Sequence, residues 1–163
     1  MKDNKKHLPI FGIGPVLCFI PAAITAVAVF LSAKGIIPGK VDITWLCRVM
    51  TILGILLIAE GIALFFCADL GGKLQDNIKE NRLKTNGSYR FVRNPCYCLY
   101  LLGCTGAHLI SHNPYLLILS VIYYIWMTVI LRRTEEKWLT DLYGAEYEEY
   151  CKRVNRLIPW PSK

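Results

Sequence analysis

Four long apolar runs, separated by short polar stretches, dominate the sequence and predict a bundle of membrane helices. They cover about residues 8–31, 43–68, 95–110 and 114–131. A membrane-spanning helix needs roughly 20 apolar residues, with a range of about 17–25, and the first two runs meet this length. The third and fourth are shorter, but each begins with an asparagine followed by a proline, Asn94 before Pro95 and Asn113 before Pro114. Because asparagine caps helices and proline favours their first position, we expect a helix to start at each pair.

The distribution of lysine and arginine orients these four spans. Sixteen of the 19 basic residues lie in three regions: the N-terminal tail, the stretch between the second and third runs, and the C-terminal tail. Four spans place all three regions on one side of the membrane, and basic loops favour the cytoplasm. We therefore predict an all-α integral membrane protein with four transmembrane helices, a C-terminal cytoplasmic amphipathic helical segment, and both termini in the cytoplasm.

The chain is predicted to form one domain, residues 1–163, with four parts along the sequence. These are an N-terminal helix pair (1–68), a cytoplasmic connector (69–94), a helical hairpin (95–131) with a tight turn at 111–113, and a cytoplasmic tail (132–163). Gly71 and Gly72 are expected to end the second helix, as glycines often do.

The tail has the spacing of an amphipathic helix. Its apolar and aromatic residues at helical spacing are Trp138, Leu142, Tyr143, Tyr147 and Tyr150. This pattern predicts a helix with one apolar face, broken near Gly144 and ended by Pro159 and Pro161. Such a helix can pack on the cytoplasmic end of the bundle or lie on the lipid surface.

Composition narrows the class of protein. Hydrophobic residues make up 54% of the 163 residues and the mean hydropathy is +0.36, which excludes an ordinary soluble domain. The net charge of +7 follows from the basic cytoplasmic regions, so it indicates contact with anionic membrane lipids rather than with nucleic acid. The seven cysteines are an odd number, mostly in apolar runs, so we expect no disulfide framework. We also expect no metal site, because the pairs His108/His112 and Cys96/Cys98 lack further ligands at suitable spacing.

Three sets of polar residues adjoin or interrupt the apolar runs. Tyr89, Arg90, Arg93 and Asn94 stand just before Pro95, where arginines and a helix N-terminus can bind an anion; the alternative is that the arginines only anchor to lipid headgroups. Glu135 and Glu136 can accept hydrogen bonds from a ligand; the alternative is a surface pairing of Arg132 with Glu136. Glu60 lies inside the second run, where an acid suggests a functional site, although a structural role is slightly favoured.

Two segments together resemble a known family. The segment TNGSYRFVRNPCY, followed by a helical hairpin and then by RRTEEKWLTDLYGAEYEEYCKRVNRLIPW, resembles the isoprenylcysteine carboxyl methyltransferases and their phospholipid methyltransferase relatives. That family shows G-x-Y-x-x-x-R-[HN]-P-x-Y, then a pair of glutamates, then F/Y-G-x-x-Y-x-x-Y and a basic residue before R-x-I-P. The likeness covers about residues 83–159. It implies a membrane-embedded methyltransferase that uses S-adenosyl-L-methionine, with the C-terminal segment closing the cofactor pocket.

The resemblance also implies roles for particular residues. The cofactor-binding residues would be Tyr89, Arg93, Asn94, Pro95, Tyr97, Gly103, Glu135, Glu136 and Tyr147. The catalytic residues would be Arg93, Tyr97 and Arg153, with Tyr97 or Arg153 orienting the acceptor. Two positions depart from the family pattern: Asn94 stands where histidine is common, and Leu99 stands where glycine is often found. Either difference could alter cofactor fit and substrate access.

The predicted function is methyl transfer from S-adenosylmethionine to a lipophilic or small apolar acceptor at the cytoplasmic membrane face. Arginine suits the donor's carboxylate, glutamates suit its amine or ribose diol, and aromatic rings suit its adenine or sulfonium. The alternatives are a non-enzymatic membrane protein that retains the fold, and a nicotinamide-dependent membrane reductase. The sequence indicates neither the acceptor atom nor an oligomeric state.

Overall fold

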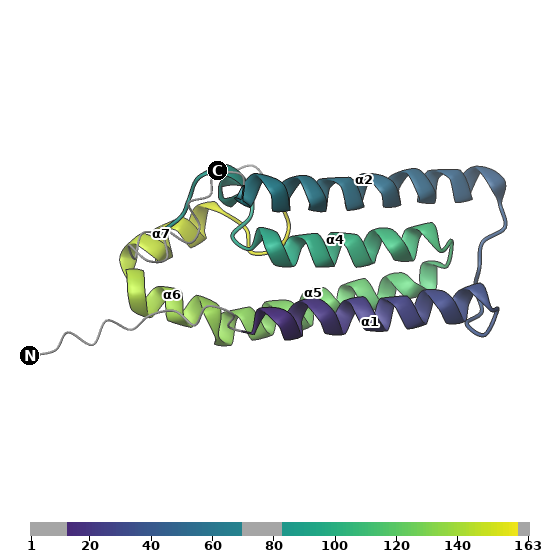
Figure 1. The fold of residues 1–163 in the computed structure, drawn as a ribbon, viewed down its shortest axis with the longest axis horizontal. Coiled ribbons are helices and arrows are strands. Elements are labelled where there is room, and N and C mark those ends of the chain that lie inside the picture. Colours follow the sequence, from purple (N-terminus) through teal and green to yellow (C-terminus); the bar gives the residue numbers. More distant parts are fainter. Residues whose placement is uncertain (1–12, 70–82, 160–163) are drawn as a thin grey trace, which may run out of the picture.

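The computed structural model describes residues 13–69 and 83–159, and these are almost entirely helical (Figure 1). The elements are α1 (Gly14–Ala33), α2 (Thr44–Asp69), the short 3-10 helix η1 (Gly87–Arg90), α4 (Pro95–Ile110), η2 (Pro114–Leu116), α5 (Leu117–Arg133), α6 (Glu135–Tyr143) and α7 (Ala145–Arg153). Within the described ranges there is no strand, only an isolated bridge between Val92 and Asn155. The predicted all-α class is confirmed.

Three helical stretches in the described ranges are long and apolar enough to cross a membrane. They are Gly14–Ala33, Thr44–Ala68 and the run Pro114–Tyr143. The third predicted span forms α4, which is apolar but has only 16 residues. The structure therefore gives three candidate spans and one shorter apolar helix.

Helix α4 lies in the middle of the bundle, with α2 on one side and α1 and α5 on the other (Figure 1). Two glycines allow α2 and α4 to approach closely. A Cβ placed on Gly106 would lie 2.5 Å from the carbonyl oxygen of Gly54, and one on Gly54 would lie 2.7 Å from that of Gly106. Small residues allow membrane helices to pack with their backbones in contact, so this crossing fixes α2 against α4.

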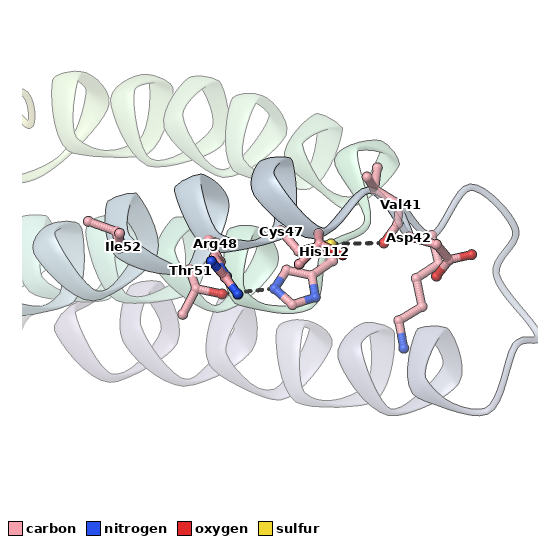
Figure 2. A pocket seen from close by; sticks show the side chains of 9 residues that line it. Val41, Asp42, Cys47, Arg48, Thr51, Ile52 and His112 are labelled. Atoms are coloured by element: carbon pink, nitrogen blue, oxygen red, sulfur yellow. Dashed lines mark hydrogen bonds between the residues drawn. The ribbon is translucent and has the colours of Figure 1, made fainter.

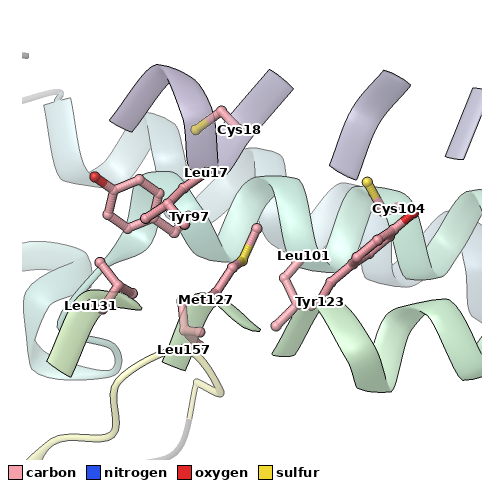
Figure 3. Close-up of a cluster of buried hydrophobic side chains, with 9 residues drawn as sticks. All are labelled: Leu17, Cys18, Tyr97, Leu101, Cys104, Tyr123, Met127, Leu131 and Leu157. Atoms are coloured by element: carbon pink, nitrogen blue, oxygen red, sulfur yellow. The ribbon is translucent and has the colours of Figure 1, made fainter. Parts of the chain in front are cut away.

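The core joins α1, α4 and α5 to the C-terminal segment (Figure 3). Leu17, Met127 and Leu131 are fully buried, and Leu157 from the segment after α7 packs in the same cluster. The C-terminal segment is thus anchored by apolar packing at the end of the bundle where α4 begins.

Polar contacts fix the opposite end of the bundle, where α4 turns into η2 and α5. The side chain of Asn113 accepts a hydrogen bond from Tyr115 N at 3.2 Å and donates to Ser32 Oγ at 2.9 Å. Both the predicted cap at Asn113 and the predicted tight turn are confirmed.

Deeper in the bundle, the two ring nitrogens of buried His108 lie 3.2 Å from Thr25 Oγ1 and 2.9 Å from Ser120 Oγ. These bonds occupy both nitrogens and tie α1, α4 and α5 together.

The tail forms two short helices rather than one. Gly144 separates α6 from α7 with a φ of 55°, a backbone conformation that favours glycine, so the predicted break is confirmed. The prediction that Pro159 and Pro161 end the helix is wrong, because α7 already ends at Arg153. Val154 adopts an extended conformation there, and the chain turns back along the connector. The glycines at 71 and 72 lie outside the described residues.

Candidate functional site

Arg93 is positioned by backbone and side-chain bonds on both sides of it. Ser88 Oγ donates to the carbonyl of Leu64 at 2.6 Å, which fixes η1 against the end of α2. The backbone N–H of Arg93 donates to the carbonyl of Asn155 at 2.8 Å. The connector and the C-terminal segment therefore run side by side, and Arg93 lies at the end of the connector, just before α4.

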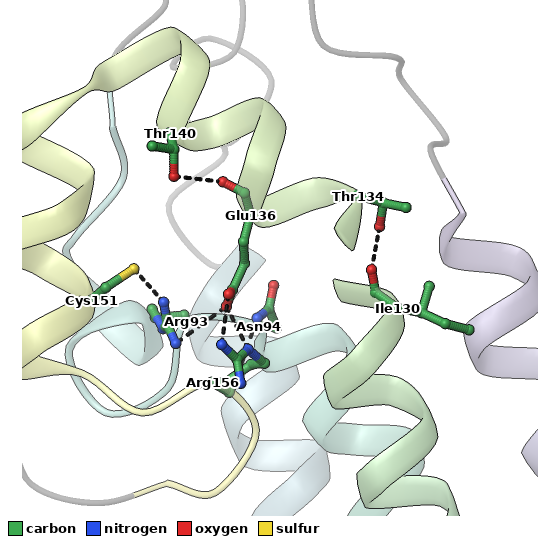
Figure 4. Close-up of polar contacts among 8 residues, drawn as sticks. All are labelled: Arg93, Asn94, Ile130, Thr134, Glu136, Thr140, Cys151 and Arg156. Atoms are coloured by element: carbon green, nitrogen blue, oxygen red, sulfur yellow. Dashed lines mark hydrogen bonds and ion pairs between the residues drawn. The ribbon is translucent and has the colours of Figure 1, made fainter. Parts of the chain in front are cut away.

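The guanidinium of Arg93 meets the carboxylate of Glu136 in a largely buried cluster (Figure 4). Its Nη2 lies 3.2 Å from Glu136 Oε1, and the two side chains are only 8% and 12% exposed. Its Nη1 donates to the thiol sulfur of Cys151 on α7. Residues more than forty positions apart in sequence thus converge.

Arg156 completes this cluster and was not among the predicted site residues. Its Nε and Nη2 donate to Glu136 Oε1 and Oε2 at 2.6 and 2.7 Å, a two-pronged ion pair. These hydrogen bonds raise the pKa of the Arg156 guanidinium. The sequence did contain a signal for this residue, because Arg156 is the arginine of the family's R-x-I-P element. We call Arg93, Glu136, Cys151 and Arg156 the arginine–glutamate cluster.

Asn94 occupies the predicted position but makes a different bond. It precedes α4, yet its side chain does not cap that helix. Instead, its amide Nδ2 donates to the carbonyl of Arg156 at 3.2 Å. The prediction that Asn94 caps α4 is therefore wrong. Asn94 instead connects the start of α4 to the segment that carries Arg156. Pro95, the first residue of α4, is buried beside it.

Glu135 points to a different neighbour from Glu136. The hydroxyl of Tyr97 donates to Glu135 Oε1 at 2.5 Å, and this tyrosine belongs to the buried core between α1 and α4. Gly14 of α1 adjoins it, since a Cβ on that glycine would lie 3.3 Å from the Tyr97 oxygen. The two adjacent glutamates thus belong to separate polar contacts at the same end of α4.

Aromatic residues of α7 cover the cluster from the tail side. Tyr147 and Tyr150 are 2% and 4% exposed and pack with Val154. The Tyr150 hydroxyl donates to the carbonyl of Tyr89 at 2.6 Å. Burial raises the pKa of both phenols, so they remain neutral near pH 7 and act as hydrogen-bonding aromatic walls.

Two predicted site residues lie away from the cluster. Arg153 is exposed on α7, where its Nη2 lies 3.7 Å from Glu149 Oε1. Gly103 is two turns along α4 from Pro95, and no atom lies within 4 Å of the position its Cβ would take. The alternative pairing of Arg132 with Glu136 is not formed, because Glu136 pairs with Arg93 and Arg156.

Two grooves lie outside this cluster. One of about 390 Å³ is lined by Glu60 of α2 and Arg90 of η1 among others, and these two form no ion pair with each other. The other, of about 610 Å³, is at the opposite end of the bundle, where Lys40, Arg48 and His112 line it (Figure 2). His112 is held there by a 2.8 Å bond between its Nε2 and Thr51 Oγ1.

The arginine–glutamate cluster has spare capacity for an anionic group. Two guanidiniums present roughly ten N–H donors, whereas one carboxylate offers about four acceptor sites. Consistent with this excess, Arg93 Nε is buried without any hydrogen-bond partner in the described part of the chain. An unpaired buried donor is costly, so the cluster favours a ligand with a carboxylate or similar acceptor.

Comparison with known proteins identifies the family to which this chain is similar. The family profile described as phospholipid methyltransferase matches residues 44–146, which include Arg93 and Glu136. A methanethiol S-methyltransferase of Bradyrhizobium diazoefficiens is 37% identical over 48% of this chain and 27% of its own length. A protein-S-isoprenylcysteine O-methyltransferase of Xenopus laevis is 28% identical over 97% of this chain and 57% of its own length. A phosphatidylethanolamine N-methyltransferase of Lachancea thermotolerans is 35% identical over 44% of this chain and 9% of its own length.

The matched part of this chain therefore spans less than two thirds of each of these relatives. No solved structure matches the chain significantly. The matching profile nevertheless extends over more than half of the sequence, from the start of α2 into α7. The protein belongs to the phospholipid methyltransferase family.

Proposed function

We propose that this protein transfers a methyl group from S-adenosylmethionine to a lipophilic or small apolar acceptor at the cytoplasmic membrane face. The observation that carries the proposal is the buried convergence of Arg93 and Arg156 on Glu136. Family membership supports the reaction type, and the apolar helices support a membrane location. The reductase alternative lacks a comparable observation among the described residues.

The side chains of the cluster suit the proposed donor. S-adenosylmethionine has a carboxylate, which matches the unpaired Nε of Arg93 and the surplus N–H groups of Arg156. Its amine and ribose hydroxyls match the acceptor oxygens of Glu136. The buried rings of Tyr147 and Tyr150 suit a cation or an aromatic base. We propose that these residues hold the donor, together with Asn94 and Tyr89, which connect the same segments.

Once bound, the donor supplies an electrophilic methyl group on a sulfonium. The protein then needs to align the reactants and exclude water, which together lower the barrier for a direct displacement. Arg93 and Arg156 fix the anionic end through charge-assisted bonds, which restrict its orientation. The tail helices cover the cluster, and Leu157 anchors the segment behind them in the core. No metal is required for this chemistry.

We further propose a four-span topology with both termini and the tail in the cytoplasm. Helix α4 has 16 residues, or roughly 24 Å at about 1.5 Å per residue, which is close to the thickness of a thin bilayer core. It lies between α2 on one side and α1 and α5 on the other, each of which is longer (Figure 1). The basic residues concentrate in the regions that this topology places inside. An apolar acceptor could then approach the cluster sideways from the inner leaflet.

Calorimetry with S-adenosylhomocysteine tests donor binding directly. Purified protein in detergent or nanodiscs should bind it, and Glu136→Gln should weaken binding strongly, because the substitution removes the carboxylate that positions both arginines and that would accept from the donor's amine and ribose hydroxyls. Glu148→Gln, on an exposed position of α7, is the matched control and should bind normally. Absence of binding by folded wild-type protein would overturn the proposal. Normal binding by Glu136→Gln would exclude the cluster as the site.

The acceptor can be identified without prior assumption. Wild-type protein is incubated with S-adenosylmethionine carrying a labelled methyl group and a total lipid and metabolite extract, and labelled products are identified by mass. We expect label in an apolar or amphiphilic product, and none with Glu136→Gln. Binding of the donor without transfer to any fraction would favour a non-enzymatic protein that retains the fold.

A further inference from the structure

The two adjacent glutamates have different surroundings, although they share one turn of α6. Glu136 is neutralised by the guanidiniums of Arg93 and Arg156. Glu135 forms no ion pair with any residue in the described ranges, and its one hydrogen bond comes from the neutral phenol of Tyr97. A carboxylate held by two arginines is a poor proton acceptor, whereas one without a cation keeps its basicity.

The geometry leaves one oxygen of Glu135 available. The Tyr97 hydroxyl donates to Oε1 at 2.5 Å. Oε2 has no hydrogen-bond partner within the described residues, and it is not one of the fully buried atoms there that lack a partner. Among the described residues, the other titratable groups facing this pair are the thiols of Cys18 on α1 and Cys96 on α4. The nearest arginines in sequence, Arg132 and Arg133, are exposed at the end of α5. Glu135 is therefore fixed at one oxygen and open at the other.

We propose that Glu135 accepts the proton which the acceptor's attacking atom loses on methylation, with Tyr97 holding the carboxylate in place. The proposal rests on the proposed function and revises the cofactor-binding role that the family resemblance implied for Glu135. Two carboxylates with opposed environments at one site often divide binding and proton transfer between them. Here Glu136 binds and Glu135 takes the proton.

The proposed step also defines the class of acceptor. The acceptor's sulfur or nitrogen would form a bond to the methyl carbon while the bond between that carbon and the sulfonium sulfur breaks. The electron pair of the broken bond stays on the donor's sulfur, so the donor leaves as a neutral thioether. The S–H or N–H proton of the acceptor passes to Oε2 of Glu135 and later to water. A carboxylate acceptor has no such proton to lose. The acceptor is therefore a lipophilic thiol or amine.

The first test compares acceptors with the variant Glu135→Gln. The acceptors are an alkanethiol, a long-chain alkylamine and a long-chain carboxylic acid. We expect transfer to the thiol or the amine, slowed by roughly 100-fold in the variant, the lower range for loss of a general base. Binding of S-adenosylhomocysteine should be unchanged, and Glu135→Asp should restore part of the rate. Use of the carboxylic acid alone, or an unimpaired variant, would overturn the proposal.

The second test measures how the transfer rate depends on pH. A merely structural role for Glu135 would leave this pH dependence unchanged. Only the unprotonated carboxylate accepts a proton, so the wild-type rate should rise with pH and the Glu135→Gln variant should lose this rise. A hydroxyl that donates to a carboxylate favours its charged form, so Tyr97→Phe should move the rise to higher pH. A Tyr97→Phe profile identical to wild type would contradict the assignment, even if the glutamine variant failed to fold.

A third readout does not depend on turnover. Infrared difference spectra between acidic and neutral pH should contain the band of a protonated carboxyl in wild-type protein, weakened in Glu135→Gln and retained in the control Glu148→Gln. Failure of the proposed function would appear differently, as absent binding of S-adenosylhomocysteine by the wild type. If binding and transfer occur but Glu135→Gln leaves the band, the rate and the pH profile intact, only the present inference fails.

Discussion

At the scale of single residues, the main finding is that Arg156 rather than Arg153 reaches Glu136. Arg156 places two donors on that carboxylate, whereas Arg153 is exposed and faces Glu149. Hydrogen bonds to charged groups contribute about 1.5–3 kcal/mol each. The identity of the arginine therefore affects how firmly the site is organised.

We predict that Arg156→Gln weakens binding of S-adenosylhomocysteine by on the order of tenfold or more, because it removes charge-assisted bonds of that size. Arg156→Lys should weaken it less, since lysine keeps the charge but lacks the planar fork. Lys152→Gln, exposed on α7, is the control, and Arg153→Gln compares the two arginines directly. Calorimetry gives all four affinities. A larger loss from Arg153→Gln than from Arg156→Gln would show that donor binding depends on Arg153 and would contradict the assignment of Arg156.

The sequence could predict the convergence but not this choice of arginine. Two polar segments flanking a helical hairpin must end on the same side of the bundle, so Arg93 and Glu136 could be expected to meet. Which tail arginine joins them depends on where α7 stops. The helix ends at Arg153, and Val154 is extended, so helical spacing no longer relates position 153 to position 156. The bond from Asn94 to a backbone carbonyl of the tail is similarly set by tertiary contact rather than by local sequence.

At the scale of elements, the contact between α2 and α4 depends on backbone proximity at two glycines. The α2 helix makes its principal contacts with α4 and η1, so little else fixes its position within the described structure. A Cβ on Gly106 would lie 2.5 Å from the carbonyl oxygen of Gly54. A Cβ on Gly103, on the same helix, would have no atom within 4 Å. These two positions form a matched pair for testing the contact.

We predict that Gly106→Ala destabilises the protein by about 1–3 kcal/mol, the usual cost of overpacking. Gly103→Ala should leave stability unchanged or slightly higher, because alanine favours helix by about 1 kcal/mol over glycine and meets no obstacle there. Thermal unfolding in one detergent compares the two with wild type. Equal destabilisation by both substitutions would show that helix contact at Gly106 is not the cause.

At the scale of the whole molecule, the bundle has two different ends. One contains the arginine–glutamate cluster and the tail helices (Figure 1), with most of the basic residues that the structure describes. The other contains the turn at Asn113 and the groove lined by Lys40 and Arg48 (Figure 2). The apolar runs made the helices predictable, and the 16-residue α4 is the helix on which the number of crossings depends.

We predict that these two ends face opposite sides of the membrane. A cysteine introduced as Lys40→Cys should react with a membrane-impermeant maleimide in intact cells, whereas Glu148→Cys should react only after permeabilisation. Both positions are exposed in the structure, so a difference in labelling reports the membrane barrier rather than burial. The unsubstituted chain, with its seven cysteines, gives the background for each condition. If both positions react in intact cells, α4 does not complete a crossing as the four-span topology requires, and the cluster would no longer be at the cytoplasmic face where the donor is made.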